Sequence, residues 1–143
     1  SKGVLNKILN KFNKNSNFYF DIDSSNLNSL EKAALIITDN SSIVFEFLLV
    51  FKRPILYINY SIKLHNLNTH KISDKTLEGS FKKEFGNEID VDNLDKLSDL
   101  YDEILRSENN IEEKVNSFNK KYFTNLGNSA NTAAKYLISK NNI

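Results

Sequence analysis

Hydrophobic residues recur along the chain at two different spacings, which predict helices alternating with strands. Spacings of three and four residues predict a helix in residues 2–14 and three more helices in the C-terminal third. A short helix over 27–32 follows the potential capping residues Ser24, Ser25 and Asn26. The apolar positions of the three C-terminal helices are Leu94, Leu97, Tyr101, Ile104 and Leu105 in the first, Ile111, Val115, Phe118 and Tyr122 in the second, and Ala130, Ala133, Ala134 and Leu137 in the third, after a turn at Gly127.

Short apolar or aromatic runs between polar clusters predict strands over 17–22, 35–38 and 55–58, and NEIDV, residues 87–91, is a candidate for a further strand. Residues 41–51 are apolar on nearly every side, which predicts a helix enclosed in the interior, and Arg53-Pro54 ends it. Strands that alternate with helices form right-handed βαβ units. We therefore expect an α/β fold, with a Rossmann-like parallel sheet flanked by helices and a helical C-terminal tail. The stretch 59–84 is polar and is expected to be irregular.

The composition limits the classes of function. The chain has 143 residues, enough for one domain with a real core. Its net charge of +1 gives no reason to expect a nucleic-acid partner. The absence of cysteine excludes disulfides, zinc–thiolate sites and thiol nucleophiles. The chain contains no Met and begins with Ser1, so we expect a piece of a longer polypeptide.

A polar segment separates two apolar runs in LIITDNSSIVFEF, residues 35–47. Thr38 and Asp39 end a predicted strand, and Ser41 and Ser42 begin a predicted helix. Ligands of parallel sheets bind beyond the carboxyl ends of the strands, and helix starts favour phosphate. The same residue types also serve as ordinary helix caps. Both interpretations, a cap and a phosphate site, remain open from these residues alone.

Glu46 places a carboxylate in the predicted interior helix. A lone buried charge costs several kcal/mol, so Glu46 must find a partner, reach solvent, or meet polar groups of a ligand. The two histidines, His65 and His70, lie in the polar stretch without a carboxylate cluster, and we expect no metal site. That stretch is either an ordinary surface loop or a segment that closes over an anionic ligand.

The segment SLEKAALIITDNSSIVFEFLLVFKRPILYINY resembles the signature of the CDP-glycerol glycerophosphotransferase family, the teichoic-acid and capsule polymerases. That signature has the form "aDlLITDYSSvmFDfallgKPiifYayD". Glu46 replaces the Asp that follows its Phe, Asn40 replaces its Tyr, and Ser61 stands where its last acidic residue would be. FTNLGNSANTAA, with Gly127 and Ser129, is similar to the family's closing helix start. The matching positions are Leu35, Ile36, Ile37, Thr38, Asp39, Ser41, Ser42, Phe45, Pro54 and Tyr60.

This resemblance implies that residues 1–143 are a single donor-binding domain, the C-terminal half of a GT-B-type transferase. It implies that the hydroxyls and the carboxylate of the TDNSS segment hold the donor's diphosphate, with Glu46 beside them and Ser129 adding a hydroxyl. It implies no cofactor. The residues implied to bind the donor are Thr38, Asp39, Ser41, Ser42, Glu46 and Ser129.

The resemblance also implies the reaction and the partners. A polyol phosphate or a sugar would pass from CDP-glycerol or another nucleotide-activated donor to a teichoic-acid or capsule polymer. The catalytic histidine and the acceptor-binding half would lie upstream, in the N-terminal half of the same protein, and the chain alone would be inactive. The expected location is cytoplasmic, at the inner face of the bacterial plasma membrane, with membrane association only through the rest of the protein.

Two other classes of protein remain possible at this point. A phosphoacceptor receiver domain would use Asp39 as its phosphorylated residue, but no Lys-Pro follows a fifth strand and no acidic pair ends an earlier strand in register. A flavodoxin-like module that only binds a ligand would share the fold and carry out no transfer.

Overall fold

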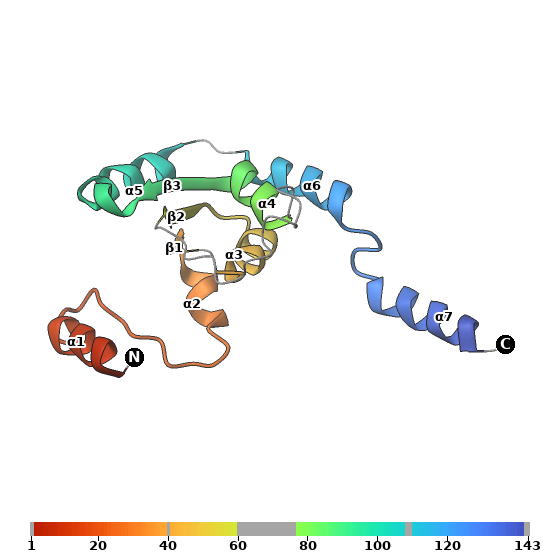
Figure 1. Ribbon diagram of the computed structural model, residues 1–143, viewed down its shortest axis with the longest axis horizontal. Helices are drawn as coiled ribbons and strands as arrows, with labels where there is room; N and C mark the ends of the chain where they lie inside the picture. Colours follow the sequence, from red (N-terminus) through yellow and green to blue (C-terminus); the bar gives the residue numbers. More distant parts are fainter. Residues whose placement is uncertain (1, 40, 60–76, 108–109, 142–143) are drawn as a thin grey trace, which may run out of the picture. The chain divides into compact units, whose positions relative to one another are not determined.

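The computed structural model describes residues 2–39, 41–59, 77–107 and 110–141, and the chain forms two compact units, Ser1–Ala33 and Ala34–Ile143 (Figure 1). His65, His70, Asn40 and Ser61 lie outside the described residues. The expectation that residues 1–143 form a single donor-binding domain stays a prediction.

The first unit contains the two helices that the hydrophobic spacing predicts. Helix α1 spans Lys2–Phe12, two residues shorter than expected, and α2 spans Leu27–Lys32, as expected. The rings of Phe12 and Phe18 lie 5.5 Å apart at the end of α1. Asn26 precedes α2 with a left-handed backbone, and its carbonyl, rather than its side chain, accepts the first hydrogen bonds of the helix.

The strand predicted over 17–22 is wrong, because these residues form a turn at Asn17 followed by irregular backbone, and they pair with no strand that the structure describes. Local side-chain bonds occupy the backbone instead: the carboxylate of Asp21 accepts from the Asp23 N–H at 2.8 Å, and Asp23 accepts from the Ser25 N–H at 3.1 Å. Such bonds compete with a sheet ladder for the same donors. Ile22 is 84% exposed, so the apolar pattern here does not mark a buried strand.

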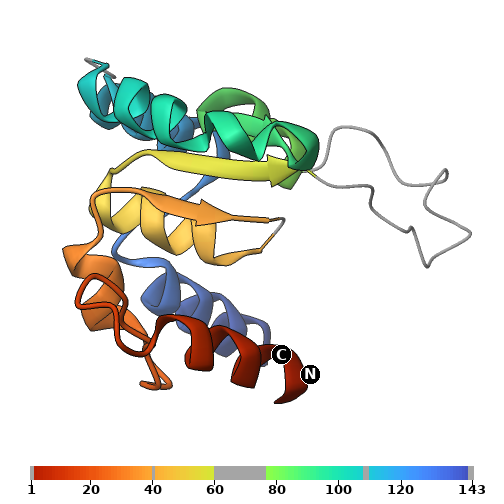
Figure 2. The ribbon, with the colours of Figure 1, turned by 90° about the vertical axis from the view of Figure 1, so that its left-hand side faces the viewer.

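The second unit is built on a parallel sheet of three strands in the order β1-β2-β3. These strands are β1, Ile36–Thr38; β2, Ile55–Asn59; and β3, Gly86–Asp90. Each lies within one or two residues of its predicted range, and Figure 2 shows β1 and β2 side by side and pointing the same way. This confirms the expected α/β class, with a parallel sheet flanked by helices.

Helices cover the two faces of this sheet. Because side chains alternate along a strand, Leu56 and Ile89 point to one face, where they pack with Ile104 of α5, Leu97–Arg106. Tyr57 points to the other face, where Lys82 of α4, Leu77–Phe85, lies over its ring at 5.1 Å. Because α4 includes residues 77–84, the prediction that these residues are irregular is wrong.

The helix predicted over 41–51 forms as two continuous pieces, α3 over Ile43–Glu46 and a wider π-helical turn, η1, over Phe47–Phe51. Phe47 and Leu48 are fully buried, but Val50 is 66% exposed. The expectation of a helix enclosed on all sides is therefore wrong, because one side faces solvent. The helix ends at Lys52, whose φ of 53° is left-handed.

Aromatic rings form the core beneath the α3 and α4 side of the sheet. Phe81 is completely buried, with its ring centroid 4.3 Å from that of Phe45 and 5.3 Å from that of Phe118. Phe118 belongs to α6, Ile111–Tyr122, and stands edge-on to Phe85 as well. The cluster thus joins α3, α4 and α6 into one packed layer.

The remaining helices agree with the predictions. A 3₁₀ segment, η3, over Val91–Lys96 leads into α5, and α7 spans Ser129–Asn141 after a turn in which Gly127 has a φ of 77°. Within the described ranges no helix combines the length and the apolarity that a membrane span requires.

Candidate functional site

The three strands end at one edge of the sheet, and their last residues set the geometry of the candidate site. The register pairs Thr38 with Tyr57 and Tyr57 with Glu88. Paired residues on parallel strands point to the same face, with strands about 4.8 Å apart. The three side chains therefore form one row on the face that α3 and α4 cover, and Asn59 and Asp90 form the next pair outward.

The segment implied to hold a diphosphate begins at the end of this row. Thr38 is half-buried, whereas Asp39, Ser41 and Ser42 are exposed. The Ser41 hydroxyl oxygen accepts a long bond of 3.5 Å from the N–H of Ile43. Ser42 is the capping residue of α3 but makes no side-chain bond to the first turn. Among the described residues, the only side-chain cap found here is therefore the long bond to Ser41, which supports the cap interpretation weakly. Ser41 and Ser42 are exposed beyond the carboxyl end of β1.

Glu46 ends α3 and is exposed. Among the described residues no polar or charged side chain is buried, so the cost of burying a charge does not arise here. Of the three outcomes open to this carboxylate, the structure shows the solvent-exposed one.

A hydrogen-bonded network joins the ends of β2 and β3 to α4. The Lys82 ammonium donates to the side-chain oxygen of Asn59 at 2.7 Å and lies 3.4 Å from the Glu88 carboxylate. The Asn59 amide donates to Glu88 at 2.7 Å and to Asp90 at 3.4 Å. Asn59 therefore has a fixed orientation, with its oxygen toward the cation and its nitrogen toward the carboxylates.

Tyr57 lies under this network and is 3% exposed. Burial, and then the nearby charge of Glu88, raises the pKa of Tyr57 to about 12. The phenol therefore stays neutral at any physiological pH. Its buried ring packs beneath the Lys82 ammonium.

Sequence reasoning missed the residues of this network. Asn59 and Asp90 end strands that were predicted, so the carboxyl-edge rule could have selected them. Lys82 was missed because α4 was not recognised, although Leu77, Phe81 and Phe85 repeat every four residues.

An open, acidic hollow borders the end of β3. Its volume is about 390 Å³, and its polar lining combines four carboxylates with one lysine and one amide. Carboxylates repel a diphosphate at close range, so this hollow does not suit one. The polar lining residues are Glu88, Asp90, Asn93, Lys96, Asp99 and Glu103.

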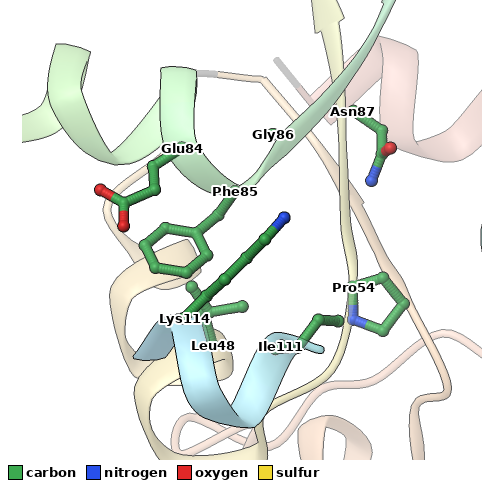
Figure 3. Close-up of a pocket in the computed structure, with 8 residues that line it drawn as sticks. All are labelled: Leu48, Pro54, Glu84, Phe85, Gly86, Asn87, Ile111 and Lys114. Carbon is green, nitrogen blue, oxygen red and sulfur yellow. The ribbon is translucent and has the colours of Figure 1, made fainter. Parts of the chain in front are cut away.

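A second hollow lies at the opposite edge, where β2 and β3 begin. It holds only about 100 Å³ between Leu48, Pro54 and Phe85, and Figure 3 shows the Lys114 side chain extending across it from α6. Asn87 at its rim donates to the Ile55 carbonyl at 3.0 Å. Small-ligand sites usually measure about 300–1,000 Å³, so we interpret this hollow as a packing gap at the amino edge.

Ser129 begins α7, as the sequence predicts. Its hydroxyl donates to the Asn125 carbonyl at 2.8 Å, so it can donate to a phosphate only after rotating. No hydrogen bond within the described part of the chain joins Ser129 to the segment around Thr38. Within those same residues no cluster of His, Asp or Glu has the geometry of a metal site.

A family model described as CDP-Glycerol:Poly(glycerophosphate) glycerophosphotransferase matches residues 4–138, which includes both segments that carry the resemblance. No curated protein and no solved structure matches the chain.

Proposed function

Because the chain belongs to the CDP-glycerol:poly(glycerophosphate) glycerophosphotransferase family, a family of transferases, we propose that it is the donor-nucleotide-binding domain of such an enzyme. Residues 4–138 account for nearly the whole chain, so the proposal concerns the entire fold. In this proposal the chain is the C-terminal half of a GT-B-type arrangement.

The position of the TDNSS segment is the observation that carries the proposal. Thr38 ends β1 at the carboxyl edge of a parallel sheet, and the exposed Ser41 and Ser42 stand between that strand and α3. Dinucleotides and other phosphate ligands bind at such edges. Hydroxyl and backbone N–H donors at this place would bind the oxygens of a diphosphate.

The residues of the segment would have different roles, because only some of them can donate. Thr38, Ser41 and Ser42 carry hydroxyls, which donate to phosphate oxygens. Asp39 and Glu46 are acceptors when ionised, so they would receive hydrogen bonds from hydroxyl groups of the donor rather than touch the phosphates. Ser129 would contribute a further hydroxyl after rotating away from Asn125.

The donor would be CDP-glycerol or a similar nucleotide-activated polyol phosphate or sugar, and the acceptor a teichoic-acid or capsule polymer. Catalytic groups and acceptor contacts would come from an N-terminal half of the same protein. The chain would work in the cytoplasm, at the inner face of the bacterial plasma membrane, with membrane contact through that other half.

Titration with CDP, followed by amide NMR, tests this function. Shifts should cluster at Thr38, Asp39, Ser41 and Ser42 and extend to Glu46. Replacing Ser41 and Ser42 together with Ala should weaken CDP binding by about tenfold to a hundredfold, as expected for lost bonds to a charged ligand.

Ser98→Ala is the matched control, because Ser98 is an exposed serine on α5, which covers the other face. It should leave CDP affinity unchanged. Absence of CDP binding by the folded chain would contradict the proposal, and covalent labelling of Asp39 by acetyl phosphate would favour a receiver domain instead.

A further inference from the structure

Among the described residues, three carboxylates lie at the carboxyl edge near the proposed diphosphate site. Glu88 and Asp90 stand on β3, and Asp39 follows β1. A CDP molecule carries about three negative charges at neutral pH, because terminal phosphates ionise fully near pH 7. Each nearby carboxylate therefore opposes its approach, and a cation fixed at this edge would offset that repulsion.

Lys82 is placed to supply this charge. Its ammonium lies 5.1 Å from the ring centre of Tyr57, the middle residue of the row that runs from Thr38 to Glu88. It is also 3.4 Å from the Glu88 carboxylate, and the Lys82 side chain is 26% exposed. The ammonium is thus on the face of the sheet to which Thr38 points, one strand away from it.

The partners of Lys82 keep it in this place. The 2.7 Å bond to Asn59 anchors the ammonium at the end of β2, and Asn59 in turn bonds Glu88 at 2.7 Å. Packing of Phe81, the neighbouring residue on α4, fixes the helix that carries it. Lys82 therefore neutralises Glu88 at a fixed point instead of moving freely in solvent.

We propose that Lys82 is an electrostatic positioning residue for the diphosphate site: it neutralises Glu88, holds Asn59 at the end of β2, and so allows an anionic ligand to approach Thr38 and Ser41. This inference rests on the proposed function, because it concerns the same site. Lys82 acts through the charge balance of the edge and through Asn59, and it need not touch the ligand.

The test compares ligands that differ in charge. Lys82→Met should weaken CDP binding by about tenfold, CMP binding by less, and binding of uncharged cytidine hardly at all. Added salt should reduce the difference between the variant and the parent chain, because it screens the exposed charges. Lys82→Arg keeps the charge and should bind CDP within about threefold of the parent chain. An equal loss for cytidine and CDP would show a purely structural role and overturn the inference.

A second variant distinguishes charge from shape. In Lys82→Met with Glu88→Gln the pair is removed without net change of charge, so CDP affinity should return to within about threefold of the parent chain. Glu88→Gln alone should tighten CDP binding severalfold, which keeps the test valid even where Lys82→Met fails to fold. Unchanged CDP affinity in both single variants overturns this inference alone. A parent chain that does not bind CDP overturns the proposed function, and this inference with it.

Discussion

The ring of Tyr57 lies directly against the backbone of Gly86, and no side chain fits between them. A β-carbon at Gly86 would come within 2.9 Å of two ring atoms of Tyr57 and within 2.5 Å of the Lys82 carbonyl oxygen. Gly86 is the first residue of β3 and pairs with Ile55, so this close approach sets the spacing between α4 and the sheet.

Gly86→Ala should lower the free energy of unfolding by about 1–3 kcal/mol, because either the strand or α4 must move to make room. Urea unfolding of the two chains measures the difference. Gly3→Ala is the control, since a β-carbon at Gly3 in α1 would meet nothing within 4 Å. That control should be neutral or slightly stabilising, by up to about 1 kcal/mol. Equal stability of Gly86→Ala and the parent chain would contradict the close packing.

Tyr57 should be the residue whose phenol ionises near pH 12, because burial and the charge of Glu88 both favour its neutral form. Ultraviolet absorbance of tyrosinate, recorded as the pH rises, follows this ionisation, and Tyr57→Phe should remove the late step. The folded pKa is above the ordinary value of 10, so the stability gained from neutral Tyr57 is present below pH 10 and is lost as the pH rises toward 12. Glu88→Gln should lower the Tyr57 pKa, but only in part, since burial is the larger cause.

Glu112 should titrate below its ordinary pKa of 4.5, because Lys52 donates a hydrogen bond to it and adds a positive charge. The pair's contribution to stability is therefore present above pH 4.5 and is lost as the pH falls through the lowered pKa. NMR of the Glu side-chain carboxyl carbons measures the shift. Lys52→Met should raise the Glu112 pKa toward 4.5, whereas Lys120→Met, at an exposed position on the same helix, should not change it. A Glu112 pKa insensitive to Lys52→Met would show that the pair does not form in solution.

Phe81→Ala should cost about 3–5 kcal/mol of stability, because it leaves a cavity among the rings of Phe45, Phe85 and Phe118. Denaturant unfolding measures the loss, and Phe81→Leu should cost less because it fills more of the space. Val50→Ala provides the exposed control and should change stability by less than about 0.5 kcal/mol. A small effect of Phe81→Ala would mean that the aromatic layer is loosely packed.

Strands β1 and β2 were predictable because they lie in short apolar runs bounded by polar clusters, and in β2 the burial of Ile55, Leu56 and Tyr57 is typical of a strand covered on both faces. The same rule gave a wrong strand over 17–22. There the aromatic run has no neighbouring strand in the part of the chain that the structure describes, and the carboxylates of Asp21 and Asp23 accept hydrogen bonds from backbone N–H groups that a ladder would need. The hydrophobic pattern alone does not show whether such a run joins a sheet or bonds locally to its own side chains.

The candidate site was only partly predictable. The segment from Thr38 to Ser42 was found because its polar residues follow an apolar strand directly. Lys82 and Asn59 were not found, because their role depends on the packing of α4 over one face of the sheet, which brings Lys82 to Asn59 on β2 and to a carboxylate on β3. Contacts between residues so far apart in the chain depend on the tertiary arrangement, which local sequence patterns do not reveal.

The π-helical turn Phe47–Phe51 bears on how this helix can vary in length, because such a turn holds one residue more than regular α-helix as a bulge. Deleting one residue from Phe47–Phe51 would leave room for a regular α-helix between Ile43 and Lys52. We therefore expect a change of one residue in this turn to leave the start of α3 and the site-bearing edge of the sheet in place.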